Sequence, residues 1–166
     1  MDFIKYPWFQ LPKIYLNNIE WPRFDIPKIG WSTMPKLRIG NTVARLPVVQ
    51  GGMGVGISLS GLASAVANAG GIGIIAANSI GMLDPDYYAK NRDANVIALR
   101  REIRKTRGKT SGIIGVNIMV AVNDFHPLLR VAIEEKVDLV FLGAGLPIKG
   151  IPVEDLRSAG SRWCLS

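Results

Sequence analysis

The chain has 166 residues, of which 48% are hydrophobic and 20% are charged, and this composition excludes a disordered or fibrous protein. One cysteine and one histidine exclude an internal disulfide and a zinc site of the usual Cys/His type. The formal net charge of +7 would suit an anionic partner if the positive charge were clustered on one surface.

The first 33 residues differ in composition from the rest of the chain. They hold eight of the 13 aromatic residues and four of the ten prolines, with no helical or strand period. We expect residues 1–33 to be an irregular aromatic and proline-rich extension, followed by a domain over 34–147. Because the N-terminus has neither a cationic stretch nor an apolar signal region, we expect a cytoplasmic protein.

From Leu46 onwards, short β-branched runs alternate with helix-length segments, which indicates βα units around a parallel sheet. The predicted strands are 46–50, 72–77, 112–119 and 138–142. The predicted helices run from Ser58 or Ser60 to Asn68, from Asp84 to Thr106, and from Asn123 to Lys136. Residues 148–166 have room for at most one short helix, and we expect a truncated or aberrant tail there.

Two features of this pattern bear on membranes and nucleic acids. The segment Leu46–Leu83 contains no charged residue, but glycines and polar residues interrupt it, so we expect no membrane span. A basic face on the second helix lacks interleaved aromatic residues, and cations near a helix C-terminus are favourable. We therefore expect a solvated face and no nucleic-acid partner. Its residues are Arg100, Arg101, Arg104, Lys105 and Arg107.

In parallel α/β folds, ligands bind at the carboxyl ends of the strands. The residues at these ends are glycines and neutral amides: Gln50-Gly51-Gly52-Met53, Asn78-Ser79, Asn117, and Gly143-Ala144-Gly145. Glycines let the backbone approach a flat ligand, and amides offer uncharged donors and acceptors. This set suits a neutral heteroaromatic ring such as a flavin. The alternative is that the glycines only make tight turns.

Other candidate motifs fit less well. The GGMGVG loop has Ile57 where the dinucleotide fingerprint requires its third glycine, and no Walker motif occurs. His126 stands beside Pro127 at the start of the third helix, where a capping or surface role is common. Asp138 precedes a strand, at the end of the sheet that serves stability, so we interpret it as structural.

Three blocks in order carry a resemblance to a known family: LPVVQGGMGVGISLSGLASAVANAGGIGIIAA, GIIGVNIMVAVNDF and DLVFLGAGLP. Over about Leu37–Pro147 they resemble the amino-terminal half of the nitronate monooxygenase family, formerly called 2-nitropropane dioxygenases. Members are FMN-dependent TIM barrels, and the flavin-dependent enoyl-acyl-carrier-protein reductases share these blocks. The resemblance implies an α/β fold of parallel βα units, the first half, with about four strands, of a truncated TIM barrel.

The resemblance also implies which residues meet FMN. The backbone of Gln50, Gly51, Gly52 and Met53 would lie along the flavin ring, and Asn117 would hydrogen-bond to it. Gly143 and Ala144 would lie near the cofactor. No catalytic residue is assigned to this chain, because the family's catalytic histidine and its phosphate-binding loops follow the fourth strand. His126 belongs to an earlier helix and does not inherit that role.

The resemblance implies oxidation of alkyl nitronates by dioxygen, in a chain that is an incomplete, inactive and marginally soluble fragment. The alternatives are a fragment of an enoyl reductase, with an enoyl substrate, and a non-enzymatic half-barrel module. A disrupted reading frame is a third explanation of the tail. We expect the open edges of a four-stranded sheet to permit self-association, or completion by another chain.

Overall fold

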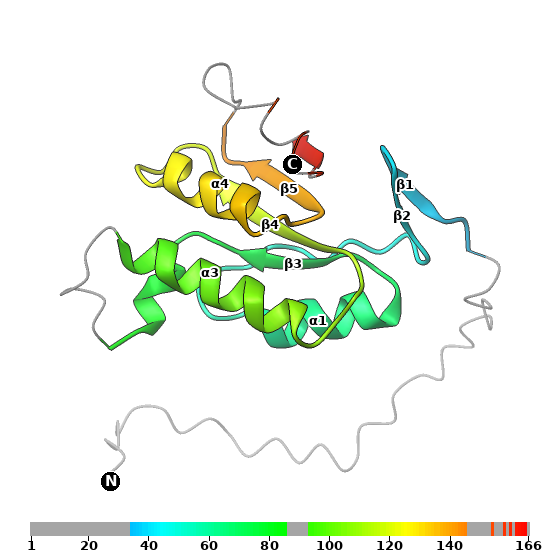
Figure 1. Cartoon of the computed structure of the whole chain (residues 1–166), viewed down its shortest axis with the longest axis horizontal. Helices are drawn as coiled ribbons and strands as arrows, with labels where there is room; N and C mark the ends of the chain where they lie inside the picture. The colour runs from blue at the N-terminus through cyan, green and yellow to red at the C-terminus, as the bar shows by residue number, and fades with distance from the viewer. Residues whose placement is uncertain are drawn as a thin grey trace, which may run out of the picture.

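The computed structural model describes residues 34–85 and 93–145, together with 154, 158, 160 and the backbone of 162–165. Its centre is a parallel sheet in the order β3 (Gly73–Ala76), β4 (Ile114–Met119), β5 (Leu139–Gly143) and β6 (Arg162–Leu165) (Figure 1). All four β3 residues are buried, as expected of a parallel strand covered on both faces. The predicted α/β class with a parallel sheet is confirmed.

Three helices cover one face of this sheet: α1 (Ser60–Ala69), α3 (Asp93–Arg107) and α4 (Phe125–Glu134) (Figure 1). Alternate strand residues point toward them, because side chains of a strand alternate between its two faces. Ile75, Val116 and Val140 therefore lie in one large core with the apolar sides of the helices. This core packs β3, β4 and β5 against the helices. The opposite face of the sheet packs against other segments of the chain.

A β-hairpin covers the amino end of the opposite face. Its strands are β1 (Leu37–Ile39) and β2 (Thr42–Ala44), paired antiparallel around a turn with Gly40 at φ +58°. Ala44 packs there in a second core with Ile74 and Leu139. This hairpin was not predicted, although Gly-Asn between two short runs that contain apolar residues is a recognised hairpin signal.

The predicted first strand, residues 46–50, is reduced to one parallel bridge between Val49 and Ile72. Two hydrogen bonds hold it, from the Gln50 amide to the Ile72 carbonyl and from the Ile72 amide to the Val48 carbonyl. Toward the amino end, the Leu46 amide donates to the Gly70 carbonyl at 2.9 Å, outside any strand pairing. The segment thus lies beside β3 but pairs with it over a shorter length than we predicted.

The predicted start of the long second helix falls beside residues outside the described part. Asp84 is an extended residue that ends a 3-10 helix, η3 (Ile80–Leu83), and its carboxylate pairs with Arg101 at 2.9 Å. α3 is described from Asp93, while residues 86–92 lie outside the described part. In the tail, Arg162–Leu165 form a strand parallel to β5, where we expected at most one short helix.

The predicted end of the first helix is confirmed, and its predicted cap is wrong. Gly70 adopts φ +96°, and the amides of Gly70 and Gly71 return to the last turn, as in a Schellman motif. Neither serine side chain caps the start of the helix. The Ser60 amide instead donates to a carboxylate oxygen of Glu102 in α3, at 3.1 Å, so a neighbouring helix supplies the cap.

Candidate functional site at the carboxyl edge of the sheet

The loops that follow the strands meet at one edge. The loop over 51–57 lies against the segment after β3: a Cβ placed on Gly56 would lie 3.1 Å from a methyl group of Leu83, and one on Gly54 would lie 3.7 Å from the Asn78 carbonyl. Met119 ends β4 and pairs in register with Gly143 at the end of β5. The sequence-predicted site residues therefore gather at this edge.

The side-chain amide of Gln50 is occupied within the protein. Its Oε1 accepts from the Ile74 amide at 3.2 Å, and its Nε2 donates to the Ile74 carbonyl at 2.9 Å. The side chain thereby continues the pairing that the Val49 bridge begins. Our expectation that this amide would be free to meet a ligand is wrong, and only the backbone of Gln50 remains for the role that the resemblance implies.

The loop Gly51–Met53 has its carbonyl groups tied back into the protein. The Gly51 carbonyl accepts from the Ser58 hydroxyl at 2.9 Å and from the Met53 amide at 3.1 Å. The Gly52 carbonyl accepts from Asn117 Nδ2 at 3.3 Å, and the Met53 carbonyl accepts from the Ser58 amide at 3.0 Å. Among the described residues, nothing accepts from the amides of Gly51 and Gly52. The amides of Gly51 and Gly52 are thus available as donors to a ligand, whereas the carbonyl groups of the loop already accept hydrogen bonds within the protein.

Asn117 combines a bonded nitrogen with an unbonded oxygen. Its Nδ2 donates to Gly52, while its Oδ1 is buried and has no hydrogen-bond partner among the described residues. Leaving a buried acceptor unpaired costs about 1–3 kcal/mol, so such an atom indicates a missing donor. A Cβ on Gly52 would lie 2.5 Å from the Asn117 side chain, which explains why glycine stands there.

The remaining predicted residues have more limited roles. The Asn78 Oδ1 accepts from the Met119 amide at 2.8 Å and links the ends of β3 and β4. The Gly143 carbonyl accepts from the Val120 amide at 2.8 Å. Ala144 adopts φ +54°, a left-handed conformation that strains a residue with a Cβ. Strain of this kind is common beside binding sites.

Methionines project from three different segments at this edge. Met53 is 53% exposed, Met82 52% and Met119 40%, and Leu83 beside them is also exposed. Met53 belongs to the loop, Met82 and Leu83 to η3, and Met119 to the end of β4. Exposed apolar side chains gathered in this way indicate a surface that another molecule covers.

Two further candidates lie away from the loop. His126 is exposed in the first turn of α4, with its ring edge-on to Phe125 at 5.0 Å. Asp138 Oδ2 accepts from the Ile114 amide at 2.8 Å and pairs with Arg107 at 3.0 Å, so it joins α3 to the start of β4. Within the described part of the chain, no group of three or more His, Cys, Asp or Glu side chains could hold a metal, and no helix is long and apolar enough to cross a membrane.

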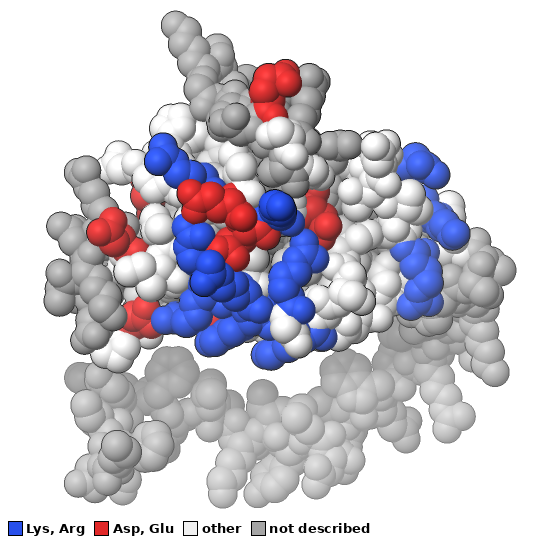
Figure 2. All heavy atoms as spheres, in the orientation of Figure 1, with Lys and Arg blue, Asp and Glu red and all other residues white. Residues whose placement is uncertain are grey.

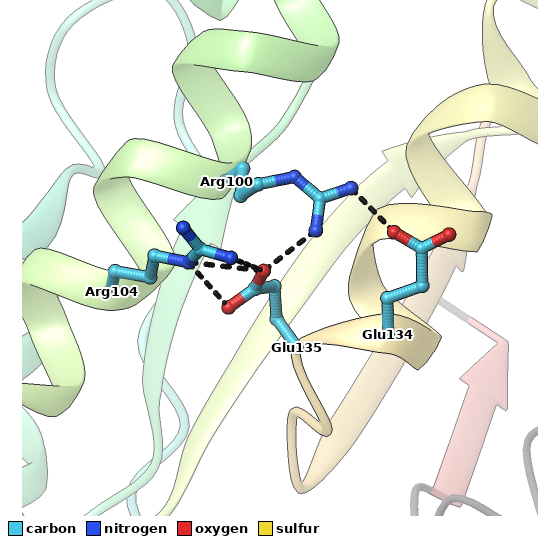
Figure 3. Close-up of polar contacts among 4 residues, drawn as sticks. All are labelled: Arg100, Arg104, Glu134 and Glu135. Carbon is cyan, nitrogen blue, oxygen red and sulfur yellow. Dashed lines mark hydrogen bonds and ion pairs between the residues drawn. The ribbon is translucent and has the colours of Figure 1, made fainter.

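The basic face of α3 is ion-paired rather than freely solvated. Figure 2 shows acidic side chains set among the basic ones on this side of the molecule. Arg104 pairs with Glu135 at 2.8 Å, and Arg100 contacts both Glu134 and Glu135 (Figure 3). Hydrogen bonds from Arg104 above all, and from Arg100, lower the pKa of Glu135. Arg101, Lys105 and Arg107 also have acidic partners. These pairs fasten α3 to α4 and to neighbouring segments.

The fold and this edge define a class of parallel α/β protein with a ligand site at the carboxyl edge of its sheet. The edge carries backbone amide donors, exposed apolar side chains and, among the described residues, a buried acceptor without a partner. A family model described as nitronate monooxygenase matches residues 37–147, and the chain belongs to that family. This confirms the resemblance found in the sequence. No curated protein matches the chain.

Two solved structures are similar to this chain. FabK from Thermotoga maritima is 36% identical, with a TM-score of 0.54 over 69% of this chain. Nitroalkane oxidase from Streptomyces ansochromogenes is 23% identical, with a TM-score of 0.54 over 74% of this chain, and supports the fold alone. The match covers 32% of FabK and 40% of the oxidase, so the chain corresponds to well under half of either relative.

Proposed function

We propose that this chain forms the ring-binding part of an FMN-dependent oxidoreductase of the nitronate monooxygenase type, which oxidises alkyl nitronates with dioxygen. The observation that carries the proposal is that, within the described part of the chain, the buried Oδ1 of Asn117 and the amides of Gly51 and Gly52 have no hydrogen-bond partner. FMN would supply a ring that accepts electrons from the substrate and passes them to dioxygen. Membership of the family supports the assignment.

The hydrogen-bonding groups at this edge suit a flavin ring. The ring system has carbonyl oxygens and a ring nitrogen that accept hydrogen bonds, and one ring N–H that donates. The Gly51 and Gly52 amides would donate to the accepting atoms of the ring, and Asn117 Oδ1 would accept from the ring N–H. The apolar rim would contact the faces of the ring. Gly143 and Ala144 would border it from the end of β5.

We infer that the architecture is the opening part of a TIM barrel. The amide and carbonyl of Val49 have no partner among the described residues, and the side chains of Val48 and Val49 are exposed. An edge of this kind accepts a further strand. We propose that another part of the barrel, in the same or a second polypeptide, occupies this edge, and that the chain alone lacks turnover.

Flavin binding tests the proposal directly. The protein is mixed with FMN or riboflavin, passed through a gel-filtration column and examined for flavin absorbance. Flavin that co-elutes supports the proposal, and a colourless protein contradicts autonomous binding. Asn117→Ala should weaken the affinity roughly tenfold, the effect of one lost hydrogen bond. Asn68→Ala is the control, because Asn68 bonds only the Lys109 carbonyl, away from this edge.

The second candidate is a flavin-dependent enoyl-acyl-carrier-protein reductase, which the 36% identity to FabK favours. The two reactions differ in the electron donor and the acceptor. With a complementing chain present, oxygen consumption on adding an alkyl nitronate would support the first candidate. Oxidation of a reduced nicotinamide on adding an enoyl thioester would support the second. Turnover of neither substrate would favour a non-enzymatic module.

A further inference from the structure

We propose that Ser58 is the positioning residue of this site: its hydroxyl holds the Gly51–Met53 loop so that only amides face the ligand. The inference rests on the proposed function for the identity of the ligand, but not for the state of the loop. Ser58 is fully buried and is not among the residues that the resemblance relates to FMN. From the sequence, Ser58 was predicted only as a possible helix cap.

Every polar group of Ser58 is engaged. The hydroxyl donates to the Gly51 carbonyl at 2.9 Å, and it accepts from the Met53 amide at 2.9 Å and from Gln50 Nε2 at 3.1 Å. A hydroxyl has one donor and two acceptor positions, so its capacity is filled. The Ser58 amide donates to the Met53 carbonyl, and its carbonyl accepts from the Ala76 amide, each at 3.0 Å.

These bonds determine the polarity of the loop. The hydroxyl joins the carbonyl at one end of a three-residue segment to the amide at the other end, so the segment is closed into a tight turn. Ala76 anchors the same residue to the end of β3. Without the hydroxyl, Gly51 would lose its stronger donor, and its carbonyl could turn toward the ligand. A carbonyl there would repel the acceptor atoms of a flavin ring.

The bonds of Ser58 to the Gly51–Met53 loop, here called the clamp, can be tested without any ligand by hydrogen exchange at the Met53 amide. In Ser58→Ala, the Met53 amide keeps only its longer bond, to the Gly51 carbonyl at 3.1 Å, so its hydrogen exchange should accelerate by up to about tenfold. Ser58→Cys, which keeps a weaker donor and acceptor, should give an intermediate rate. Ser64→Ala is the matched control, since Ser64 is also buried but bonds only Gly61 within its own helix. Unchanged exchange at Met53 in Ser58→Ala would overturn the inference.

Flavin measurements then connect the clamp to the ligand. In Ser58→Ala, riboflavin affinity should fall about tenfold, and the reduction potential of the bound flavin should become more negative, because fewer donors stabilise the reduced ring. Equal affinity and potential in Ser58→Ala and the wild type would refute the positioning role while leaving the proposed function intact. A wild type that binds no flavin would refute autonomous binding, and the exchange experiment would still decide the clamp. Circular dichroism verifies that each variant is folded.

Discussion

Replacing Glu102 by alanine should lower the free energy of unfolding by about 2–3 kcal/mol. α1 begins after Leu59, which provides no side-chain cap, and Glu102 Oε2 accepts from the Ser60 amide at 3.1 Å. A hydrogen bond to a charged group contributes about 1.5–3 kcal/mol. The Lys105 ammonium, 3.1 Å away, adds less than about 1 kcal/mol, because it is half exposed.

The same carboxylate makes stability depend on pH. Burial alone would raise the pKa of Glu102, but hydrogen bonds from Ser60 and Lys105 outweigh it, and the pKa lies below its ordinary 4.5. A pKa that is lower in the folded than in the unfolded state adds stability at neutral pH. That contribution disappears as the pH falls below about 4.5 and through the lowered pKa.

Urea denaturation followed by circular dichroism, at pH 7 and at acidic pH, measures both effects. Glu102→Gln keeps the shape and should remove part of the acid-dependent loss, while Glu102→Ala removes the cap as well. Glu134→Gln is a control, because Glu134 is largely exposed and its pair should contribute less than about 1 kcal/mol. If Glu102→Gln matched the wild type in stability and in its response to acid, the capping argument would be refuted.

Three further variants test the packing and the seam between α3 and α4. Gly73→Ala should destabilise the protein by at least about 3 kcal/mol in the same urea assay, because its Cβ would lie 1.9 Å from the Ala63 carbonyl. Gly61→Ala should stabilise it by about 0.5–1 kcal/mol, since this helical glycine faces open space. In Glu135→Gln, the loss of the carboxylate that pairs with Arg104 should lower the urea midpoint at pH 7 but not at a pH below the lowered pKa of Glu135, and added salt should shrink the difference. A midpoint equally lowered at both pH values would contradict an electrostatic role for Glu135.

The sequence predicted those parts of the fold whose cause is local. β3 is an apolar run buried on both faces, and Gly70 ends α1 because a left-handed residue is needed there. The cap of α1 could not be predicted in this way, because it comes from Glu102, 42 positions along the chain. In the same way, the pairing of Gln50 with Ile74 depends on how two segments lie together in the fold.

At the candidate site, the residue types at the strand ends predicted which edge of the sheet carries the site. They did not predict which side-chain amides are already hydrogen-bonded within the protein. Asn117 and Gln50 are both neutral amides after or within a strand, and the sequence does not distinguish them. The structure does, because one oxygen is buried without a partner and the other pairs with a backbone amide. The strand Arg162–Leu165 was not predicted, because its four residues mix charged, aromatic and apolar side chains without a strand period.

The hairpin of β1 and β2 covers apolar residues of the sheet. Ala44 packs on Ile74 and Leu139 at the amino end of the face opposite the helices, with Leu37 and Ile39 beside them. A polypeptide that began at the first βα unit, near Leu46, would leave this end of the sheet as an uncovered apolar surface. A version shortened at its amino end should therefore keep Leu37, where the family match also begins.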